Sequence, residues 1–205
     1  MRLGLLGGTF DPPHHGHLRV ARIAQDRARL DAVLFVPCFR QPLKPRPPAA
    51  SGYHRAAMVA LALSGRTDWG LETAELERKG TSYTADTVEL LMSRMPGAEV
   101  FLLLGADSLA SFRRWKRYGF LLEACRIVAV PRPGVDLAAS VPSTWRDRVL
   151  LASARPSRVS STMVRARAAR GESLTGWAPA SVARYIVREG LYGAAAPHIA
   201  RGRHS

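Results

Sequence analysis

Short apolar runs alternate along the chain with longer stretches in which apolar residues recur every three or four positions. The short runs predict strands at residues 2–6, 32–37, 69–73, 100–104, 126–130 and 148–152. The longer stretches predict helices at residues 15–29, 54–64, 84–94 and 107–122. Because strands that alternate with helices form parallel sheets covered on both faces, we expect an α/β fold, doubly wound around a mostly parallel sheet.

The end of the chain has a different pattern. Two further helices are predicted near residues 161–170 and 180–189, and no strand follows them. We therefore expect one domain over residues 1–193, in which the helices at about 160–190 form a small C-terminal extension. Residues 194–205 are small or polar without apolar periodicity, which predicts a disordered tail.

Length and composition narrow the class of protein. The chain has 205 residues, of which 47% are hydrophobic and 22% charged, an ordinary mixture for one globular core. No apolar run approaches about 20 residues, and glycines interrupt the N-terminal apolar run early. We therefore expect a cytoplasmic protein without a membrane span. Cys38 and Cys125 are expected to be free thiols.

The net charge of +14 raises the question of a nucleic-acid partner. Only three of the 30 basic residues are lysines, and the arginines are scattered along the chain. No basic run is interleaved with aromatic residues, as a groove for a single strand would require. The charge therefore favours an anionic small-molecule ligand, with no nucleic acid and no membrane as partner. A basic regulatory or nucleic-acid-binding protein on a nucleotide-binding fold stays open as an alternative.

The block Gly7–His17 carries the strongest chemical signal. It follows the first predicted strand and opens the first predicted helix, which is where α/β proteins hold phosphate. The glycines allow a sharp turn, and His14 and His17, three residues apart, should share one face of the first helical turn. A plain turn with a surface histidine pair is the simpler interpretation. Half of a metal site is another, but no cluster at ligand spacing supplies further ligands.

This block resembles the (His/Thr)-x-Gly-His signature of a family of nucleotidyltransferases, and within them the chain is similar to the bacterial nicotinate-nucleotide adenylyltransferases. Further matches occur in order at residues 80–87, 104–109 with Trp115 following, 159–165 and 182–192. The resemblance implies a Rossmann-like fold and transfer of the adenylyl group of ATP to nicotinate mononucleotide. The products are deamido-NAD and pyrophosphate, and Mg²⁺ is carried by ATP. Nicotinamide mononucleotide or phosphopantetheine as acceptor stays open, and a homo-oligomer is compatible with the sequence.

Adenylyl transfer makes modest demands on side chains, because the attacking phosphate is already an anion. The resemblance implies that the catalytic groups are His14, His17, Lys44 and Arg165. It implies that ATP is bound by Gly7, Gly8, Thr9, Phe10, Gly16, Gly105, Asp107, Ser160, Ser161 and Thr162. The simpler interpretations are a helix cap for Asp107, and an N-cap with a solvated arginine for Ser160 to Arg165.

Nicotinate mononucleotide is expected to contact Ser82, Tyr83, Thr84, Trp115 and Arg55. Backbone amides at a helix start can bind a pyridine carboxylate, and an indole can stack on the pyridine ring. A buried tryptophan without a ligand is the simpler interpretation of Trp115. The chain departs from the family at two neighbouring positions: Leu43 precedes Lys44 where a histidine is frequent, and His54 precedes Arg55 where an acid is usual.

Overall fold

The computed structural model describes residues 1–44, 46–131, 133–134, 136–137, 139, 141–155 and 157–194. Its strands form one sheet in the order β3-β2-β1-β4-β5-β6, and every paired ladder is parallel. The strands are β1 (Arg2–Gly8), β2 (Ala32–Pro37), β3 (Trp69–Leu71), β4 (Glu99–Gly105), β5 (Cys125–Val130) and β6 (Val149–Leu151). This confirms the predicted doubly wound α/β fold with its parallel sheet.

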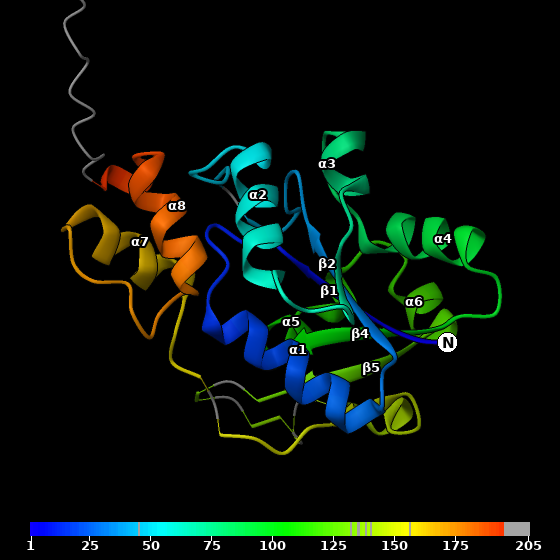
Figure 1. Ribbon diagram of the computed structural model, residues 1–205. Coiled ribbons are helices and arrows are strands. Elements are labelled where there is room, and N and C mark those ends of the chain that lie inside the picture. Colours follow the sequence, from blue (N-terminus) through cyan, green and yellow to red (C-terminus); the bar gives the residue numbers. More distant parts are fainter. Residues whose placement is uncertain are drawn as a thin grey trace, which may run out of the picture.

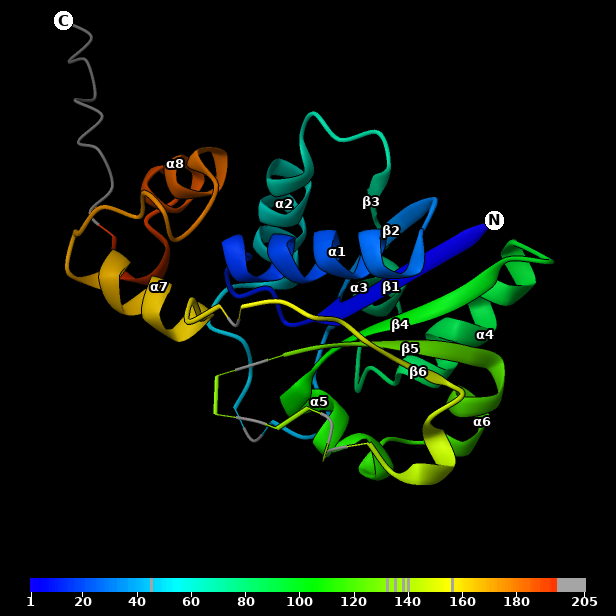
Figure 2. The same ribbon diagram turned by 90° about the horizontal axis from the view of Figure 1, so that it is seen from below.

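Helices cover both faces of the sheet (Figures 1 and 2). One face packs against α1 (His15–Ala28) and α2 (Gly52–Leu63), and the other against α4 (Thr84–Arg94), α5 (Ala106–Ala110) and α6 (Tyr118–Ala124). Neighbouring residues of β4 separate accordingly, since Phe101 lies in the first core and Leu102 in the second. This burial on both faces explains why the strands are continuous apolar runs.

The C-terminal helices form a third core with α2. In α7 (Ser161–Ala169) and α8 (Ala180–Arg188), Val164, Val182 and Ile186 are fully buried and cluster with Met58 of α2. Both helices lie beyond the end of the sheet towards which β1 runs (Figure 2). They therefore stand at the edge where the carboxyl ends of the parallel strands meet.

The structure departs from the predicted elements in three places. The helix expected over residues 107–122 is divided into α5, a 3₁₀ turn η1 (Phe112–Arg114) and α6, with Arg117 in the left-handed region at φ 56°. The short helix α3 (Ala74–Arg78) and the 3₁₀ turns η2 (Ser143–Trp145) and η3 (Leu191–Gly193) lacked a periodic signal. Ala194, expected in the tail, is buried in the third core, and residues 195–205 lie outside the described residues. No helix in the described parts of the chain has both the length and the apolar character needed to cross a membrane.

Candidate active site

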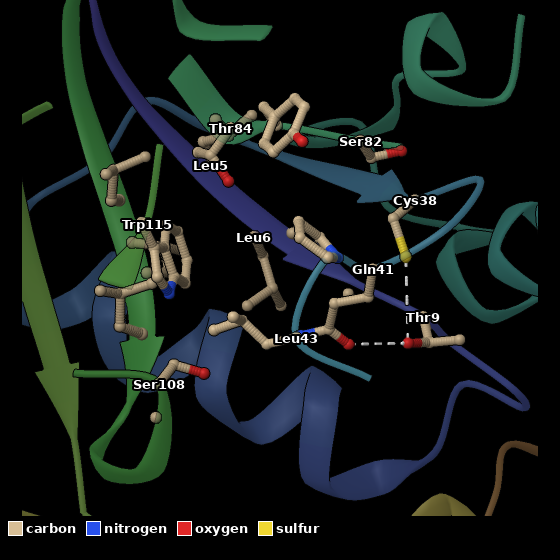
Figure 3. A pocket seen from close by; sticks show the side chains of 18 of the residues that line it. Leu5, Leu6, Thr9, Cys38, Gln41, Leu43, Ser82, Thr84, Ser108 and Trp115 are labelled. Carbon is tan, nitrogen blue, oxygen red and sulfur yellow. Dashed lines mark hydrogen bonds between the residues drawn. The ribbon is translucent and has the colours of Figure 1, made fainter. Parts of the chain in front are cut away.

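A cavity of about 410 Å³ opens at the carboxyl ends of β1, β2 and β4. Strand order changes direction here, because β2 lies on one side of β1 and β4 on the other, and α/β proteins bind ligands beside such a point. Trp115 and Ser108 lie across the cavity from Cys38 and Thr9, with Leu43 between them (Figure 3). The expected site residues that line it are Gly7, Gly8, Thr9, His17, Lys44, Ser82, Tyr83, Thr84, Gly105, Asp107 and Trp115.

The two glycines that end β1 serve different purposes. A Cβ atom on Gly7 would meet no atom within 4 Å, so the backbone there is open to a ligand. A Cβ on Gly8 would lie 3.0 Å from Cζ of Phe10, whose buried ring folds back over the glycine. The same ring packs edge-on against His17, with the ring centroids 4.9 Å apart. Because Gly8 has no side chain, the Phe10 ring can lie over it and pack against His17. Phe10 itself does not line the cavity.

The two histidines form a reciprocal cap at the start of α1. Nδ1 of His14 accepts the Gly16 N–H at 3.1 Å, and Nδ1 of His17 accepts the His14 N–H at 3.2 Å. The proton of each neutral ring therefore resides on Nε2. His14 is the N-cap residue with extended backbone, directly before the first residue of α1. The rings still stack, with centroids 3.8 Å apart, but His14 is buried and only His17 lines the cavity.

The loop after β2 forms one wall. The Thr9 hydroxyl lies 3.2 Å from Oε1 of Gln41 and 3.3 Å from Nζ of Lys44, which donates to it. Leu43, in place of the frequent histidine, points into the cavity (Figure 3). Burial raises the pKa of the Cys38 thiol, and both Cys38 and Cys125 are free thiols, as predicted. Lys44 thus lies beside the Gly7–His17 block, as its expected contact with phosphate requires.

The adjoining wall is the N-terminus of α4. Thr84 begins this helix, and within the described residues Tyr83, its N-cap, makes no side-chain capping bond. The Ser82 hydroxyl accepts the Phe39 N–H at 2.9 Å and is therefore held in place between the two walls. Buried Glu75 accepts from the Thr87 hydroxyl at 2.7 Å, and burial raises the pKa of its carboxyl. Glu75 lines the cavity although no periodic or motif signal pointed to it.

Trp115 stands at the break between η1 and α6, where its backbone is extended. Its half-buried ring packs on Phe112 at a centroid distance of 5.2 Å and contributes to the cavity wall. Lys116 follows, with its Nζ 4.3 Å from the centroid of the Tyr83 ring and 3.4 Å from Oδ1 of Asp86. Lys116 also lines the cavity, and its position next to Trp115 was the available sequence signal for it.

Arg55 lies elsewhere than expected. Its side chain is 1% exposed and donates to the carbonyl oxygens of Thr9 at 2.8 Å, Cys38 at 2.7 Å and Ala50 at 3.2 Å. It does not line the cavity, so the expected contact with nicotinate mononucleotide has to be corrected. Arg55 instead ties the Gly7–His17 block to the loop after β2, because four backbone acceptors, with the Phe39 carbonyl at 3.5 Å as the fourth, surround one buried cation.

The start of α7 meets the Gly7–His17 block outside the cavity. Ser160 is the N-cap, as its simpler interpretation predicted, and its hydroxyl accepts the Met163 N–H at 3.3 Å. The Ser161 hydroxyl donates to the Pro12 carbonyl at 2.9 Å, and Arg165 Nη1 donates to the Asp11 carbonyl at 2.7 Å. A Cβ on Gly16 would lie 3.1 Å from the Val159 carbonyl, so this glycine allows the close approach. The described cavity does not include Gly16, Arg165 or residues 160–162.

Comparison with known proteins defines the class of this fold and site. The cytidylyltransferase-like family model matches residues 5–167, which makes the chain a nucleotidyltransferase. It is 36% identical over 191 residues to the nicotinate-nucleotide adenylyltransferase of Bacillus subtilis, covering 93% of this chain and 98% of that protein. A relative from Halalkalibacterium halodurans, named "Probable nicotinate-nucleotide adenylyltransferase", is 42% identical over 192 residues, covering 93% and 91%. The chain belongs to the nicotinate-nucleotide adenylyltransferase family, which confirms the resemblance found in the sequence.

A solved structure supports the fold independently. Plasmodium falciparum nicotinic acid mononucleotide adenylyltransferase, complexed with NaAD, matches with a TM-score of 0.75 over 94% of this chain and 97% of that one. The two sequences are 16% identical. Its sheet and flanking helices thus match those of the present chain, although little sequence is shared.

Proposed function

We propose that the enzyme transfers the adenylyl group of ATP to nicotinate mononucleotide, giving deamido-NAD and pyrophosphate. One observation carries this proposal: a single cavity joins the open backbone at Gly7 and the His17 side chain to the start of α4 and the Trp115 ring. The Gly7 backbone and the His17 side chain suit a phosphate, whereas the start of α4 and the Trp115 ring suit a pyridine ring with a carboxylate. Relatives of closely similar length are named for this reaction.

The reaction needs alignment and charge stabilisation. A phosphate oxygen of nicotinate mononucleotide attacks the α-phosphorus of ATP, the bond from that phosphorus to the bridging oxygen breaks, and pyrophosphate leaves. Because this oxygen is already anionic, no side chain has to act as the nucleophile. His17 donates from Nε2 to the phosphate oxygens on which charge develops, and Lys44 neutralises the same region. His14 fixes the start of α1 and stacks on His17.

For the remaining phosphates of ATP we propose the start of α7. Ser160, Ser161, Thr162 and Arg165 adjoin the Gly7–His17 block through Pro12 and Asp11. A β- or γ-phosphate that passes His17 would meet the N–H groups of α7 and the guanidinium of Arg165, which lies 3.4 Å from the Thr162 hydroxyl. For the ribose we propose Gly105, which ends β4, and exposed Asp107 of α5, because both line the cavity.

The donor set fits a cation that enters with ATP. Within the described residues no group of three or more His, Cys, Asp or Glu side chains is placed to hold a metal ion, and the acidic side chains among those that line the cavity are Glu75 and Asp107. A hydrated Mg²⁺ bound mainly by phosphate oxygens suits such surroundings. We propose Mg²⁺ in this role, where it screens the negative charge of the triphosphate.

Nicotinate mononucleotide is proposed to bind between Trp115 and the start of α4. The ring of Trp115 stacks on the pyridine, and the N–H groups near Thr84 donate to the pyridine carboxylate. Ser82 and Tyr83 shape this wall, and the ammonium of Lys116 adds positive charge beside it. The same features disfavour phosphopantetheine, which has neither an aromatic ring nor a carboxylate. The expectations of a cytoplasmic enzyme without a nucleic-acid partner stay predictions.

Pyrophosphate release from ATP and Mg²⁺, measured with a panel of acceptors, tests the proposal. We expect turnover with nicotinate mononucleotide, less with nicotinamide mononucleotide and none with phosphopantetheine. Release that is fastest with phosphopantetheine would overturn the assigned acceptor. Absence of release with every acceptor would instead favour a regulatory protein on the same fold.

A further inference from the structure

Asp11 links three parts of the chain behind the cavity. Its carboxylate is 5% exposed and accepts the N–H groups of Ala49 at 2.7 Å and Ala50 at 3.1 Å. These residues end the loop that carries Lys44. The same carboxylate accepts the hydroxyl of Tyr192 at 2.7 Å, from a segment 181 residues further along the chain. Asp11 is therefore shared between the Gly7–His17 block, the Lys44 loop and η3 of the C-terminal extension.

Tyr192 is held in a backbone conformation that a residue with a side chain rarely adopts. Its φ is 61° and its ψ is 22°, in the left-handed region that favours glycine. Such a conformation persists where the surroundings impose it, and the hydroxyl of Tyr192 is fixed by Asp11. Burial, together with the charge of Asp11, raises the pKa of the Tyr192 hydroxyl, so it keeps its proton and remains a donor.

The hydrogen bond between Tyr192 and Asp11 lies next to the residues that contact the catalytic groups. Phe10, next to Asp11, packs against His17, and the Lys44 ammonium contacts Thr9. On this basis, and resting on the proposed adenylyl transfer, we propose that Tyr192 is a positioning residue. Through Asp11 it sets the Gly7–His17 block against the Lys44 loop, so that His17 and Lys44 point at the same phosphates. Tyr192 touches no substrate.

Tyr185 provides a matched control within the same extension. It lies on α8, and its hydroxyl is 2.9 Å from Nδ1 of His54 on α2. Both tyrosines thus join the C-terminal extension to the rest of the chain through one hydroxyl. Only the bond of Tyr192 reaches the Gly7–His17 block, so a general loosening of the extension and a loss of positioning can be separated.

The test compares Tyr192→Phe with Tyr185→Phe in the full chain, with ATP, Mg²⁺ and nicotinate mononucleotide. We expect Tyr192→Phe to lower kcat roughly three- to tenfold, the cost of one hydrogen bond, and to change KM for nicotinate mononucleotide by less than about twofold. Tyr185→Phe should keep kcat within about twofold of the wild type. In a His17→Ala background, Tyr192→Phe should lower kcat by a smaller factor, because the imidazole that Tyr192 positions is absent.

Hydrogen exchange of the Ala49 and Ala50 amides supplies a second measurement without substrate. Faster exchange in Tyr192→Phe, but not in Tyr185→Phe, is expected. The proposal is overturned if Tyr192→Phe retains wild-type kcat, if both variants lose kcat equally, or if Tyr192→Phe does not fold. A wild-type protein that forms no deamido-NAD would instead overturn the proposed function, and the exchange rates would still test the link through Asp11.

Discussion

The Gly7–His17 block has two sides with different chemistry. On the cavity side lie the open backbone of Gly7, the His17 ring and the nearby Lys44 ammonium, which is exposed. On the other side, Asp11 and Arg55 are almost fully buried and bind backbone groups of neighbouring loops. Charged side chains on the cavity side are thus available to a ligand, whereas those behind the block maintain its shape. Residue type alone does not distinguish the two roles.

The largest effect should come from the buried side. Arg55→Met leaves the carbonyls of Thr9, Cys38 and Ala50 without this donor and removes one of the cations near Asp11. We expect the free energy of unfolding to fall by about 3–5 kcal/mol, measured by urea denaturation. Arg22→Met, on the exposed face of α1, is the control and should change the unfolding midpoint little. An equal loss of unfolding free energy in both variants would contradict the structural role of Arg55.

Substitution of a residue on the cavity side should lower the catalytic rate. His17→Ala removes a donor that acts when charge develops, so kcat should fall by about 10²- to 10³-fold, with a smaller change in KM for nicotinate mononucleotide. His15→Ala is the matched control, because His15 is exposed and does not line the cavity. Steady-state kinetics and melting temperatures of both variants separate catalysis from folding. A His17→Ala enzyme that keeps more than about a third of wild-type kcat contradicts the assignment.

A smaller effect is expected in the acceptor half of the cavity. Trp115→Ala should raise KM for nicotinate mononucleotide roughly three- to tenfold and leave KM for ATP unchanged, because stacking is worth about 0.5–1.5 kcal/mol beyond area burial. Trp69→Ala, which removes an indole from β3 away from the cavity, should change neither constant. If KM for ATP rises instead, the two halves of the cavity are assigned the wrong way round.

The smallest effect concerns pH. Burial raises the pKa of Glu75 in the folded protein above its ordinary value of 4.5, so folding favours the protonated carboxyl. Its contribution to stability is complete below the ordinary pKa and is lost as pH rises through the raised value. From about pH 4 to about pH 7, the wild type should therefore lose stability relative to Glu75→Gln. Urea titrations at several pH values measure this difference, and a constant difference would contradict it.

Strong local signals made the fold largely predictable. The six strands were found because burial on both faces requires continuous apolar runs, and the helix at residues 84–94 matches α4 to the residue. The break in the helix expected at 107–122 was missed, because the residues around Trp115 have helical spacing while the chain turns there. Helix α3 was missed because its five residues are too few to show a period.

Site residues could be predicted where they belong to a short sequence motif or lie close to one. His17, Lys44, Trp115 and the start of α4 line the cavity as expected. Arg55 was misjudged, because a guanidinium that binds phosphate and one that binds carbonyls look alike in a sequence. The link from Asp11 to Tyr192 joins residues far apart in the chain, and no local pattern encodes such a contact.

The preference between the acid and amide acceptors tests the proposed function most directly. A carboxylate can accept from the N–H groups at the start of α4, whereas the NH₂ of the amide cannot, so one donor would lose its partner. Such a loss costs about 1–3 kcal/mol, or about tenfold to a hundredfold in kcat/KM. With the same saturating ATP and Mg²⁺, we predict that kcat/KM for nicotinate mononucleotide exceeds that for nicotinamide mononucleotide by this factor. Equal values, or a preference for the amide, would contradict the assigned acceptor site.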